Sequence, residues 1–142
     1  MEFDPLKLEN QLCFPLYACS REVVKQYTPL LEKIGLTYTQ YIVMLVLWED
    51  GEISAKDLGA KLFLDSGTLT PLLKRLESNG LIVRARSAKD ERSLTITITD
   101  KGRALKEKAA SIPLDIRTCI NLPPEEAATL YQLLYKVLGN FK

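Results

Sequence analysis

Residues 65–76 carry hydrophobic side chains at the spacing of an α-helix. Four leucines fall at positions i, i+3, i+4 and i+7, which places them on one stripe: Leu69, Leu72, Leu73 and Leu76. Asp65 and Ser66 come directly before this stripe, and both residue types cap helices by accepting hydrogen bonds from unpaired N–H groups of the first turn. The pattern predicts a helix that begins near Asp65 and buries its leucines.

The opposite face of this helix is short, hydroxyl-rich and basic. It carries Ser66, Thr68, Thr70, Pro71, Lys74 and Arg75. Such side chains suit a helix that enters the major groove of DNA, because hydroxyls reach phosphates and base edges and arginine pairs bidentately with guanine. We expect Lys74 and Arg75 to divide between phosphate and base. Taken alone, the helix fits an ordinary amphipathic helix with a solvated face slightly better.

The preceding segments predict two more helices. Thr37 and Gln40 form a capping box for the first. Its expected buried positions are Ile42, Leu45 and Val46. Ser54 caps the second, and residues 63–64 separate it from the helix at Asp65. Two helices joined by a tight turn, the second with a hydroxyl-rich and basic face, are typical of a helix-turn-helix.

From Leu81 the hydrophobic period changes from helical to two. Residues 81–86 and 94–99 read LIVRAR and LTITIT, and the polar loop SAKDERS joins them. This alternation predicts a β-hairpin with a projecting charged tip, known as a wing. A helix-turn-helix followed at once by a wing is a much stronger indication of DNA binding than either part alone.

The charges of the wing suggest separate roles. We expect Arg92 to enter a narrow minor groove, where the potential is most negative. Asp90 repels phosphate and is expected to pair with an arginine and fix its direction. Arg84 and Arg86 are expected to contact the DNA backbone or support the wing. For two further tip residues we expect plain solvation: Lys89 and Glu91.

Helices are also predicted at both chain ends. The first is expected to begin with Asp4 as cap and to run past Pro15, which should kink it, until Pro29 ends or bends it. After the hairpin, a helix runs from Thr99 or Asp100 to about Ser111, and Pro113 interrupts it. Pro123 and Pro124 open the last helix, and its expected hydrophobic stripe is Leu130, Leu134, Val137 and Phe141.

The elements together predict a mainly α fold with a small β-hairpin, organised as one domain over residues 1–142. A winged helix-turn-helix occupies about 37–99. The helices at about 1–36 and 100–142 form a dimerisation region, because their apolar stripes exceed what one small domain needs. A two-fold dimer would present two DNA-facing helices to successive major grooves of an inverted repeat, about 34–36 Å apart.

Composition narrows the chemistry more than it narrows the fold. The net charge is +1, yet six basic and three acidic residues lie between Lys74 and Arg92, which makes a modest basic patch. The absence of histidine removes histidine-based acid–base, metal and nucleophile chemistry. Cys13, Cys19 and Cys119 are too few, and odd in number, for a disulfide framework. No apolar run spans a membrane and no signal segment opens the chain, so we expect a cytoplasmic protein without a cofactor.

Three blocks carry a resemblance to a known family. LDSGTLTPLLKRLE, GLIVRARSAKDERSLTITIT and TDKGRAL resemble the MarR family of winged-helix repressors. NQLCFPLYACSRE and LTYTQYIVMLVLWE narrow the resemblance to the OhrR type, the organic-hydroperoxide sensors, with the SarZ and MgrA group related. The resemblance covers nearly the whole chain. It implies a homodimeric repressor on an inverted-repeat DNA operator, which is a sensor and not an enzyme. Pro15 departs from the family pattern.

The resemblance also implies site residues. The sensor is one N-terminal cysteine, here Cys13. Its thiolate is bound by tyrosines matching Tyr27 and Tyr38 of the partner subunit, with a residue matching Tyr17 close by. Some members carry a resolving cysteine near Cys119 that pairs with the sensor of the other subunit. Judged from its neighbours alone, Cys13 is better interpreted as a buried, inert thiol, and the two tyrosines as core packing.

Under this resemblance, a hydroperoxide oxidises Cys13 to a sulfenic acid, and a second thiol traps it as a disulfide. Cys19 lies about 9 Å along an intact helix from Cys13, beyond the reach of a bridge, and we expect it to be structural. Cys119, or a small cellular thiol, remains as the trap. A repressor released by an aromatic or phenolic ligand, with Cys13 a bystander, stays an alternative. A thiol peroxidase carries little weight because no thioredoxin-like alternation appears.

Overall fold

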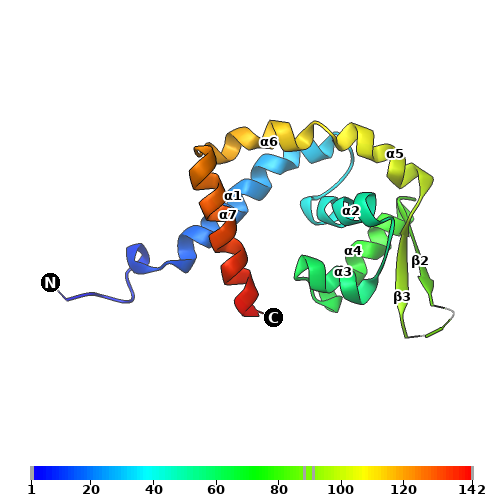
Figure 1. Ribbon diagram of the computed structural model, residues 1–142, viewed down its shortest axis with the longest axis horizontal. Coiled ribbons are helices and arrows are strands. Elements are labelled where there is room, and N and C mark those ends of the chain that lie inside the picture. The colour runs from blue at the N-terminus through cyan, green and yellow to red at the C-terminus, as the bar shows by residue number, and fades with distance from the viewer. Residues whose placement is uncertain (1, 88, 91, 142) are drawn as a thin grey trace.

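The computed structural model describes residues 2–87, 89–90 and 92–141. Figure 1 shows that α2, α3, α4 and a small sheet gather on one side, and that α1, α6 and α7 form the other. The helices are α1 (Cys13–Glu32), α2 (Tyr38–Asp50), α3 (Ala55–Leu62), α4 (Ser66–Ser78), α5 (Asp100–Ala109), α6 (Ile112–Ile120) and α7 (Pro124–Leu138). Two 3₁₀ turns, η1 (Leu8–Asn10) and η2 (Gly139–Phe141), lie near the chain ends.

The sheet is antiparallel and contains one strand more than predicted. Its strands are β1 (Glu52–Ser54), β2 (Ile82–Arg86) and β3 (Leu94–Ile98), in the order β1-β3-β2. The hairpin predicted at 81–86 and 94–99 is confirmed, with Ile82 opposite Ile98 and Arg84 opposite Ile96. β1 escaped prediction because three residues between a helix turn and a helix cap are too few to display a period of two.

The predicted capping chemistry is confirmed at four helix starts. Thr37 and Gln40 form the reciprocal capping box of α2. The side chains of Ser54, Asp65 and Thr99 accept hydrogen bonds at the starts of α3, α4 and α5. Because each cap satisfies an otherwise unpaired backbone donor, the helix starts are set locally by sequence. The order of helices and strands, with the hairpin after α4, confirms the predicted mainly α winged-helix fold.

The core lies beneath α4 and the sheet. Of the leucines predicted on the stripe of α4, Leu72 is half-buried and the other three are buried. The buried hydrophobic residues of this core include Leu31, Tyr41, Met44, Leu47, Leu58, Leu69, Leu73, Leu76, Ile82 and Ile96. The prediction for α2 was partly wrong: Val46 is buried and Ile42 half-buried, but Leu45 is 42% exposed.

The N-terminal helix begins later than predicted. The chain from Asp4 forms a turn and η1, and α1 starts at Cys13. Asp4 caps only this turn, by accepting a 2.9 Å hydrogen bond from the N–H of Leu6. Pro15 consequently lies in the first turn of α1, where no N–H has an intrahelical partner, so the expected kink does not arise there. Pro29 lies inside α1 and does not end it.

The C-terminal region contains one helix more than predicted, α6, although its prolines lie where the helices begin or break. The helical region is interrupted near Pro113 as predicted, because α5 ends at Ala109 and α6 begins at Ile112. Pro113 itself lies in the first turn of α6, where its fixed φ and missing N–H suit a helix start. Cys119 therefore lies on α6 and not in a break before the last helix. Pro123 and Pro124 open α7 as predicted. α6 packs along α1, so the N-terminal helix lies against a helix from the C-terminal part of the chain.

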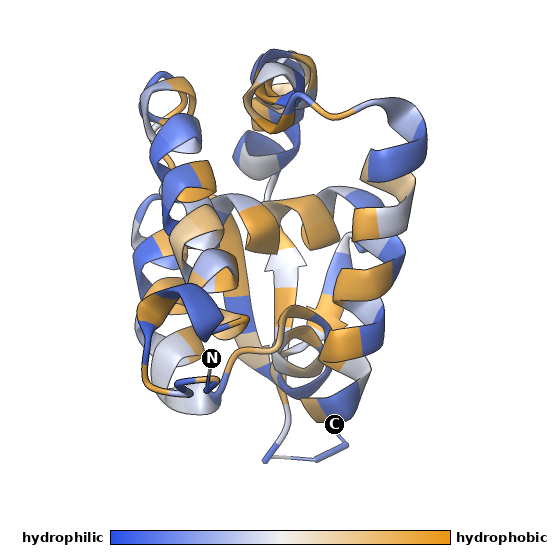
Figure 2. Cartoon of the chain, turned by 90° about the vertical axis from the view of Figure 1, so that its left-hand side faces the viewer, coloured by the Kyte–Doolittle hydropathy of each residue, from blue (hydrophilic) through white to orange (hydrophobic). Residues whose placement is uncertain are grey.

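An extended apolar surface is left uncovered on α1, α6 and α7. Figure 2 views the side of the molecule to which the N-terminal arm and α7 belong, and shows hydrophobic residues along these helices. α7 buries no residue in the single chain. The exposed large hydrophobic residues include Leu12, Phe14, Leu16, Leu114, Ile120, Leu130, Tyr131, Leu134, Tyr135, Val137 and Phe141. An apolar patch of this kind is typical of a protein interface.

Candidate functional site

The exposed face of α4 is ready to contact a partner. Asp65 Oδ1 accepts a 2.7 Å hydrogen bond from the N–H of Thr68, and this bond lowers the pKa of the Asp65 carboxyl. Because the leucines face the core, the hydroxyl and basic residues point outward. All six predicted DNA-facing residues are exposed: Ser66, Thr68, Thr70, Pro71, Lys74 and Arg75. This arrangement offers hydroxyl donors and two cations on one helix face.

The wing is attached to α4 through an ion pair. Glu77 on α4 accepts hydrogen bonds from the backbone N–H of Arg84 at 2.9 Å, and from its Nε and Nη2 at 3.2 and 3.0 Å. Of the two roles predicted for Arg84, this geometry favours that of a wing support. The hydrogen bond from the backbone of Arg84, aided by its guanidinium, lowers the pKa of Glu77.

The tip of the wing is shaped by Asp90. Its Oδ1 accepts a 3.0 Å hydrogen bond from the N–H of Arg92, and its Oδ2 accepts a 3.4 Å bond from the hydroxyl of Ser93. Asp90 thus fixes the backbone that carries Arg92. The side chains of Arg86 and Arg92 are exposed. Lys89 is exposed as expected, whereas Glu91 lies outside the described residues.

Three aromatic side chains gather where α1 meets α2, and we call Tyr27, Tyr38 and Tyr41 the tyrosine cluster. Ring centroids of Tyr27 and Tyr38 are 4.9 Å apart, and Tyr41 lies 5.7 and 6.3 Å from them. Burial raises the pKa of Tyr27 to about 12, with smaller contributions from Tyr38, Tyr41 and Cys119. Burial likewise raises the pKa of Tyr38 and of Tyr41. These phenols are neutral hydrogen-bond donors at physiological pH.

The three cysteines lie in different surroundings. Cys13 is the first residue of α1, and Cys19 lies less than two turns further on. Cys119, on α6, is near enough to Tyr27 to influence its ionisation. All three thiols are exposed in the single chain, so Cys13 is not buried within one protomer as its sequence neighbours suggested. The structure thus places Cys119 on a helix that packs against the one carrying Tyr27, and keeps Cys13 at the far end of α1.

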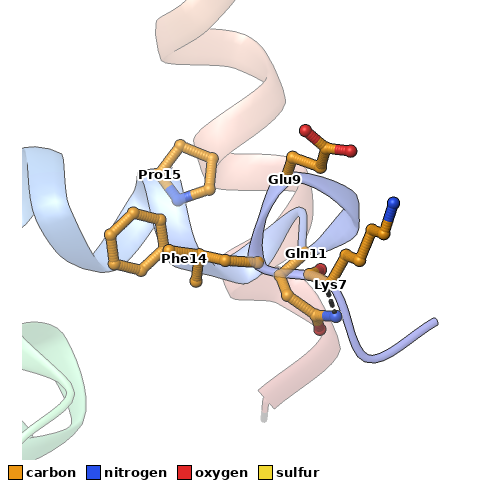
Figure 3. A pocket seen from close by; sticks show the side chains of 6 residues that line it. Lys7, Glu9, Gln11, Phe14 and Pro15 are labelled. Atoms are coloured by element: carbon orange, nitrogen blue, oxygen red, sulfur yellow. Dashed lines mark hydrogen bonds between the residues drawn. The ribbon is translucent and has the colours of Figure 1, made fainter. Parts of the chain in front are cut away.

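The surroundings of Cys13 are open. Tyr17, one turn further along α1, accepts a 2.9 Å hydrogen bond from Arg21 Nη1, which leaves its own hydroxyl proton free to be donated. An open pocket of about 710 Å³ lies between η1 and the first turn of α1, the turn that Cys13 begins; Figure 3 shows its lining side chains. Phe14 and Pro15 line it, and Gln11 Nε2 donates a 3.0 Å hydrogen bond to the carbonyl of Lys7 at its rim.

Two relevant residues were missed by the sequence interpretation. Tyr41 follows Tyr38 at i+3, so the helical period contained the signal that both belong to one face. The partnership of Glu77 with Arg84 had no such signal, because it joins a helix to a strand across a turn. Among the described residues no group of three or more acidic or cysteine side chains could hold a metal ion. Within the same residues no helix is both long and apolar enough to cross a membrane.

Comparisons with known proteins agree with this geometry. Residues 25–109 match the family described as "Transcriptional regulator SarA/Rot". The organic hydroperoxide resistance transcriptional regulator of Bacillus subtilis is 53% identical over 96% of this chain and 93% of its own. The structure of reduced AbfR bound to DNA is 40% identical over 94% of both chains, with a TM-score of 0.77, and AbfR is a Staphylococcus epidermidis protein.

Two further structures extend the comparison. The disulfide form of AbfR is 40% identical over 92% of both chains, with a lower TM-score of 0.66. A cysteine-to-serine mutant of Escherichia coli MarR, solved with operator DNA, is 27% identical over 89% of this chain and 93% of its own, with a TM-score of 0.81. The chain therefore belongs to the MarR-like winged-helix transcriptional regulators of the SarA/Rot family, with the organic-hydroperoxide resistance regulator among its relatives, and not to a family of enzymes.

Proposed function

We propose that this protein is a homodimeric, redox-sensing repressor that binds an inverted-repeat operator and leaves it when an organic hydroperoxide oxidises Cys13. The observation that carries the proposal is the separation of Cys13 from the tyrosine cluster. Cys13 and Tyr27 both lie on α1 and are fourteen residues apart, which is about 21 Å of helix rise. One chain cannot join this thiol to these phenols, but a second copy with antiparallel α1 can.

The exposed apolar surface supports the dimer on which this arrangement depends. Uncovered side chains lie along α1, α6 and α7. Of these helices, α1 carries Cys13 and α6 carries Cys119. Pairing these helices about a two-fold axis buries the patch and brings the start of one α1 toward the tyrosine cluster of the partner. The two neutral phenols of Tyr27 and Tyr38 then donate hydrogen bonds to the Cys13 thiolate, with Tyr17 as a third donor.

The proposed chemistry has two steps. The thiolate of Cys13 attacks the outer oxygen of the hydroperoxide and the O–O bond breaks, which gives the sulfenic acid and an alkoxide; the alkoxide takes a proton from water and leaves as the alcohol. A second thiol then attacks the sulfenic sulfur, so that an S–S bond forms and water leaves. Cys119 of the partner subunit is the favoured second thiol, because it lies on α6, which packs along the helix that carries Tyr27, and is close enough to influence that phenol.

The AbfR structures support a disulfide as the releasing form. Reduced AbfR is bound to DNA, overoxidised AbfR is also bound to DNA, and a disulfide form has been solved as well. The structure of this chain resembles the two DNA-bound forms, each with a TM-score of 0.77, more than it resembles the disulfide form, with a TM-score of 0.66. We infer that the present conformation is the DNA-binding one and that the disulfide changes it.

The DNA contacts follow from the exposed faces of α4 and the wing. Ser66, Thr68, Thr70 and Pro71 are assigned to the major groove, and Lys74 and Arg75 to phosphate and base. Arg92 is assigned to the minor groove, with Asp90 holding its backbone and Arg86 beside the DNA strand. Because this partner is double-stranded chromosomal DNA, the proposed place of action is the cytoplasm.

The test adds cumene hydroperoxide to the protein on a labelled inverted-repeat operator. Fluorescence anisotropy measures how much protein is released. After peroxide, the operator affinity of wild type and of the matched control Cys19→Ser should fall at least about tenfold, whereas that of Cys13→Ser should not change. A Cys13→Ser variant that is still released contradicts the proposal and favours a regulator that responds to a ligand. Intact mass identifies the second thiol: a covalent dimer absent from Cys119→Ser supports Cys119, and a monomer carrying an adduct indicates a small thiol.

A further inference from the structure

A continuous series of contacts leads from the tyrosine cluster to the point where α4 gives way to the wing. It begins with Tyr41, which is 3% exposed and touches the rings of both Tyr27 and Tyr38. Tyr41 also meets Trp48, two turns further along α2, with ring centroids 6.3 Å apart at 67°. The four rings form one packed group, so a displaced phenol must move its neighbours.

Trp48 extends this group to α5. Its indole Nε1 donates a 2.8 Å hydrogen bond to the carbonyl of Gly102, in the first turn of α5. The Gly102 N–H in turn donates to the hydroxyl of Thr99, the cap of α5, at 3.0 Å. Trp48 therefore connects the aromatic group to the start of the helix that follows the wing.

The start of α5 is packed directly on the helix–wing junction, by which we mean Gly80 and Leu81. The Thr99 hydroxyl donates to the carbonyl of Gly80 at 2.6 Å, and the Thr99 N–H donates to the carbonyl of Leu81 at 3.1 Å. A Cβ on Gly102 would collide with that same Leu81 carbonyl. Because the two segments are packed this closely, a movement of the first turn of α5 must also move the helix–wing junction. This junction sets the angle between α4 and β2.

We propose that Trp48 is a positioning residue that transmits the state of the tyrosine cluster to the helix–wing junction. The inference rests on the proposed function, since the signal is the oxidation of Cys13 beside Tyr27 and Tyr38. The indole is suited to this task because its ring packs edge-to-face with Tyr41 while its N–H donates to a backbone carbonyl of α5. Packed groups of this kind change between discrete arrangements, which converts a small displacement into a change of angle.

The first test replaces Trp48 by phenylalanine, which keeps an aromatic ring and removes the donor to Gly102. The ratio of operator Kd after and before cumene hydroperoxide is measured in the full-length dimer. Trp48→Phe should bind the operator within about twofold of wild type when reduced, and its ratio should fall by about tenfold. Mass spectrometry should find Cys13 oxidised at the wild-type rate. A wild-type ratio in Trp48→Phe overturns the proposal.

A matched control removes another hydrogen bond at the same place. Lys101 Nζ donates to the carbonyl of Asn79 at 2.9 Å, next to the junction, and does not touch the aromatic group. Lys101→Met should retain the wild-type ratio, and an equal loss in both variants overturns the assignment to Trp48. If wild type itself is not released, the proposed function and the inference fall together. If wild type and Trp48→Phe are both fully released, the inference alone falls.

A second measurement needs no change at Trp48 and so does not depend on the folding of a variant. Trp48 is the single tryptophan of the chain, and its emission therefore reports on this position alone. After peroxide is added, the emission of the wild-type protein should shift with the same time course as operator release, and Cys13→Ser should give no shift. An unchanged emission during complete release overturns the proposal.

Discussion

Glu77 and Arg84 join the DNA-facing helix to the first strand of the wing by three hydrogen bonds, one from the arginine backbone and two from its guanidinium. A carboxylate that accepts both kinds of donor fixes the strand as well as the side chain. Because the guanidinium of Arg84 already binds Glu77, it is less available to bind DNA phosphate than the guanidinium of an exposed arginine. The wing is thus oriented by a contact that is made before DNA arrives.

This assignment predicts different salt behaviour for two wing arginines. Arg92→Gln should lower operator affinity and reduce the slope of log K against log salt by about one, with half-site spacing unchanged, because a DNA-bound cation is lost. Arg84→Gln should lower affinity with an unchanged slope, because its guanidinium binds Glu77. Titrations at several salt concentrations measure both. An equal loss of slope in Arg84→Gln would mean that Arg84 contacts phosphate.

The lowered pKa of Glu77 predicts acid sensitivity. A carboxyl whose pKa is lower in the folded protein stabilises it fully above the usual value of 4.5, and this contribution is lost as pH falls through the lowered pKa. Thermal melts between pH 3 and 7 should therefore show a smaller acid loss for Glu77→Gln than for wild type. The matched control Glu22→Gln removes an exposed carboxylate paired with Lys25, and it should leave the acid loss unchanged.

The phenols of the tyrosine cluster should govern how fast Cys13 reacts. Tyr27→Phe and Tyr38→Phe each remove one donor to the thiolate and should slow oxidation by about tenfold. Stopped-flow oxidation by cumene hydroperoxide measures this rate. Ser78→Ala, which removes an exposed hydroxyl on α4 outside both the cluster and the apolar surface, is the control. Wild-type rates in both cluster variants would exclude the phenols from the sensor.

The same phenols define a pH limit. Because burial raises the pKa of Tyr27 to about 12, its hydroxyl stays protonated, and able to donate, at pH values where an ordinary tyrosine begins to ionise. The oxidation rate of wild type should therefore not fall between about pH 8 and pH 10. A decline of the rate in this interval would show that the donors are lost earlier than their burial predicts.

The core beneath α4 predicts a graded loss of stability. Leu76 is fully buried, and Leu76→Ala should cost about 2–5 kcal/mol of unfolding free energy, because it removes buried surface and leaves a cavity. Leu72 is only half-buried, so Leu72→Ala should cost clearly less. Urea unfolding of the reduced protein measures both. Equal losses would contradict the burial difference between the two leucines.

The local chemistry of the chain could be predicted from sequence with good accuracy. Thr37, Ser54, Asp65 and Thr99 cap the helices that they were expected to cap, because a cap is satisfied within three residues. The wing was also predictable, since alternation over five residues is a strong signal. These features depend on neighbours in sequence, so no knowledge of distant contacts was needed.

Features that depend on distant contacts or on the exact start of a helix were harder to predict. Asp4 and Pro5 look like a helix start, yet the helix begins at Cys13, and Pro15 then occupies a harmless first turn. The helix α6, which carries Cys119, was not predicted, because a proline that interrupts one helix also suits the start of the next. The neighbourhood of Tyr27 and Cys119 arises from α6 lying along α1, which no local pattern encodes.

The central claim is that a change at one sulfur, Cys13, decides whether the dimer stays on its operator. The most direct measurement follows a single sample of wild-type protein on labelled operator DNA during stepwise addition of cumene hydroperoxide. Anisotropy gives the released fraction, and intact mass of the same aliquots gives the fraction with Cys13 in a disulfide. We expect the released fraction and the fraction with Cys13 in a disulfide to rise together. Complete conversion of Cys13 to a disulfide in protein that remains bound would contradict it.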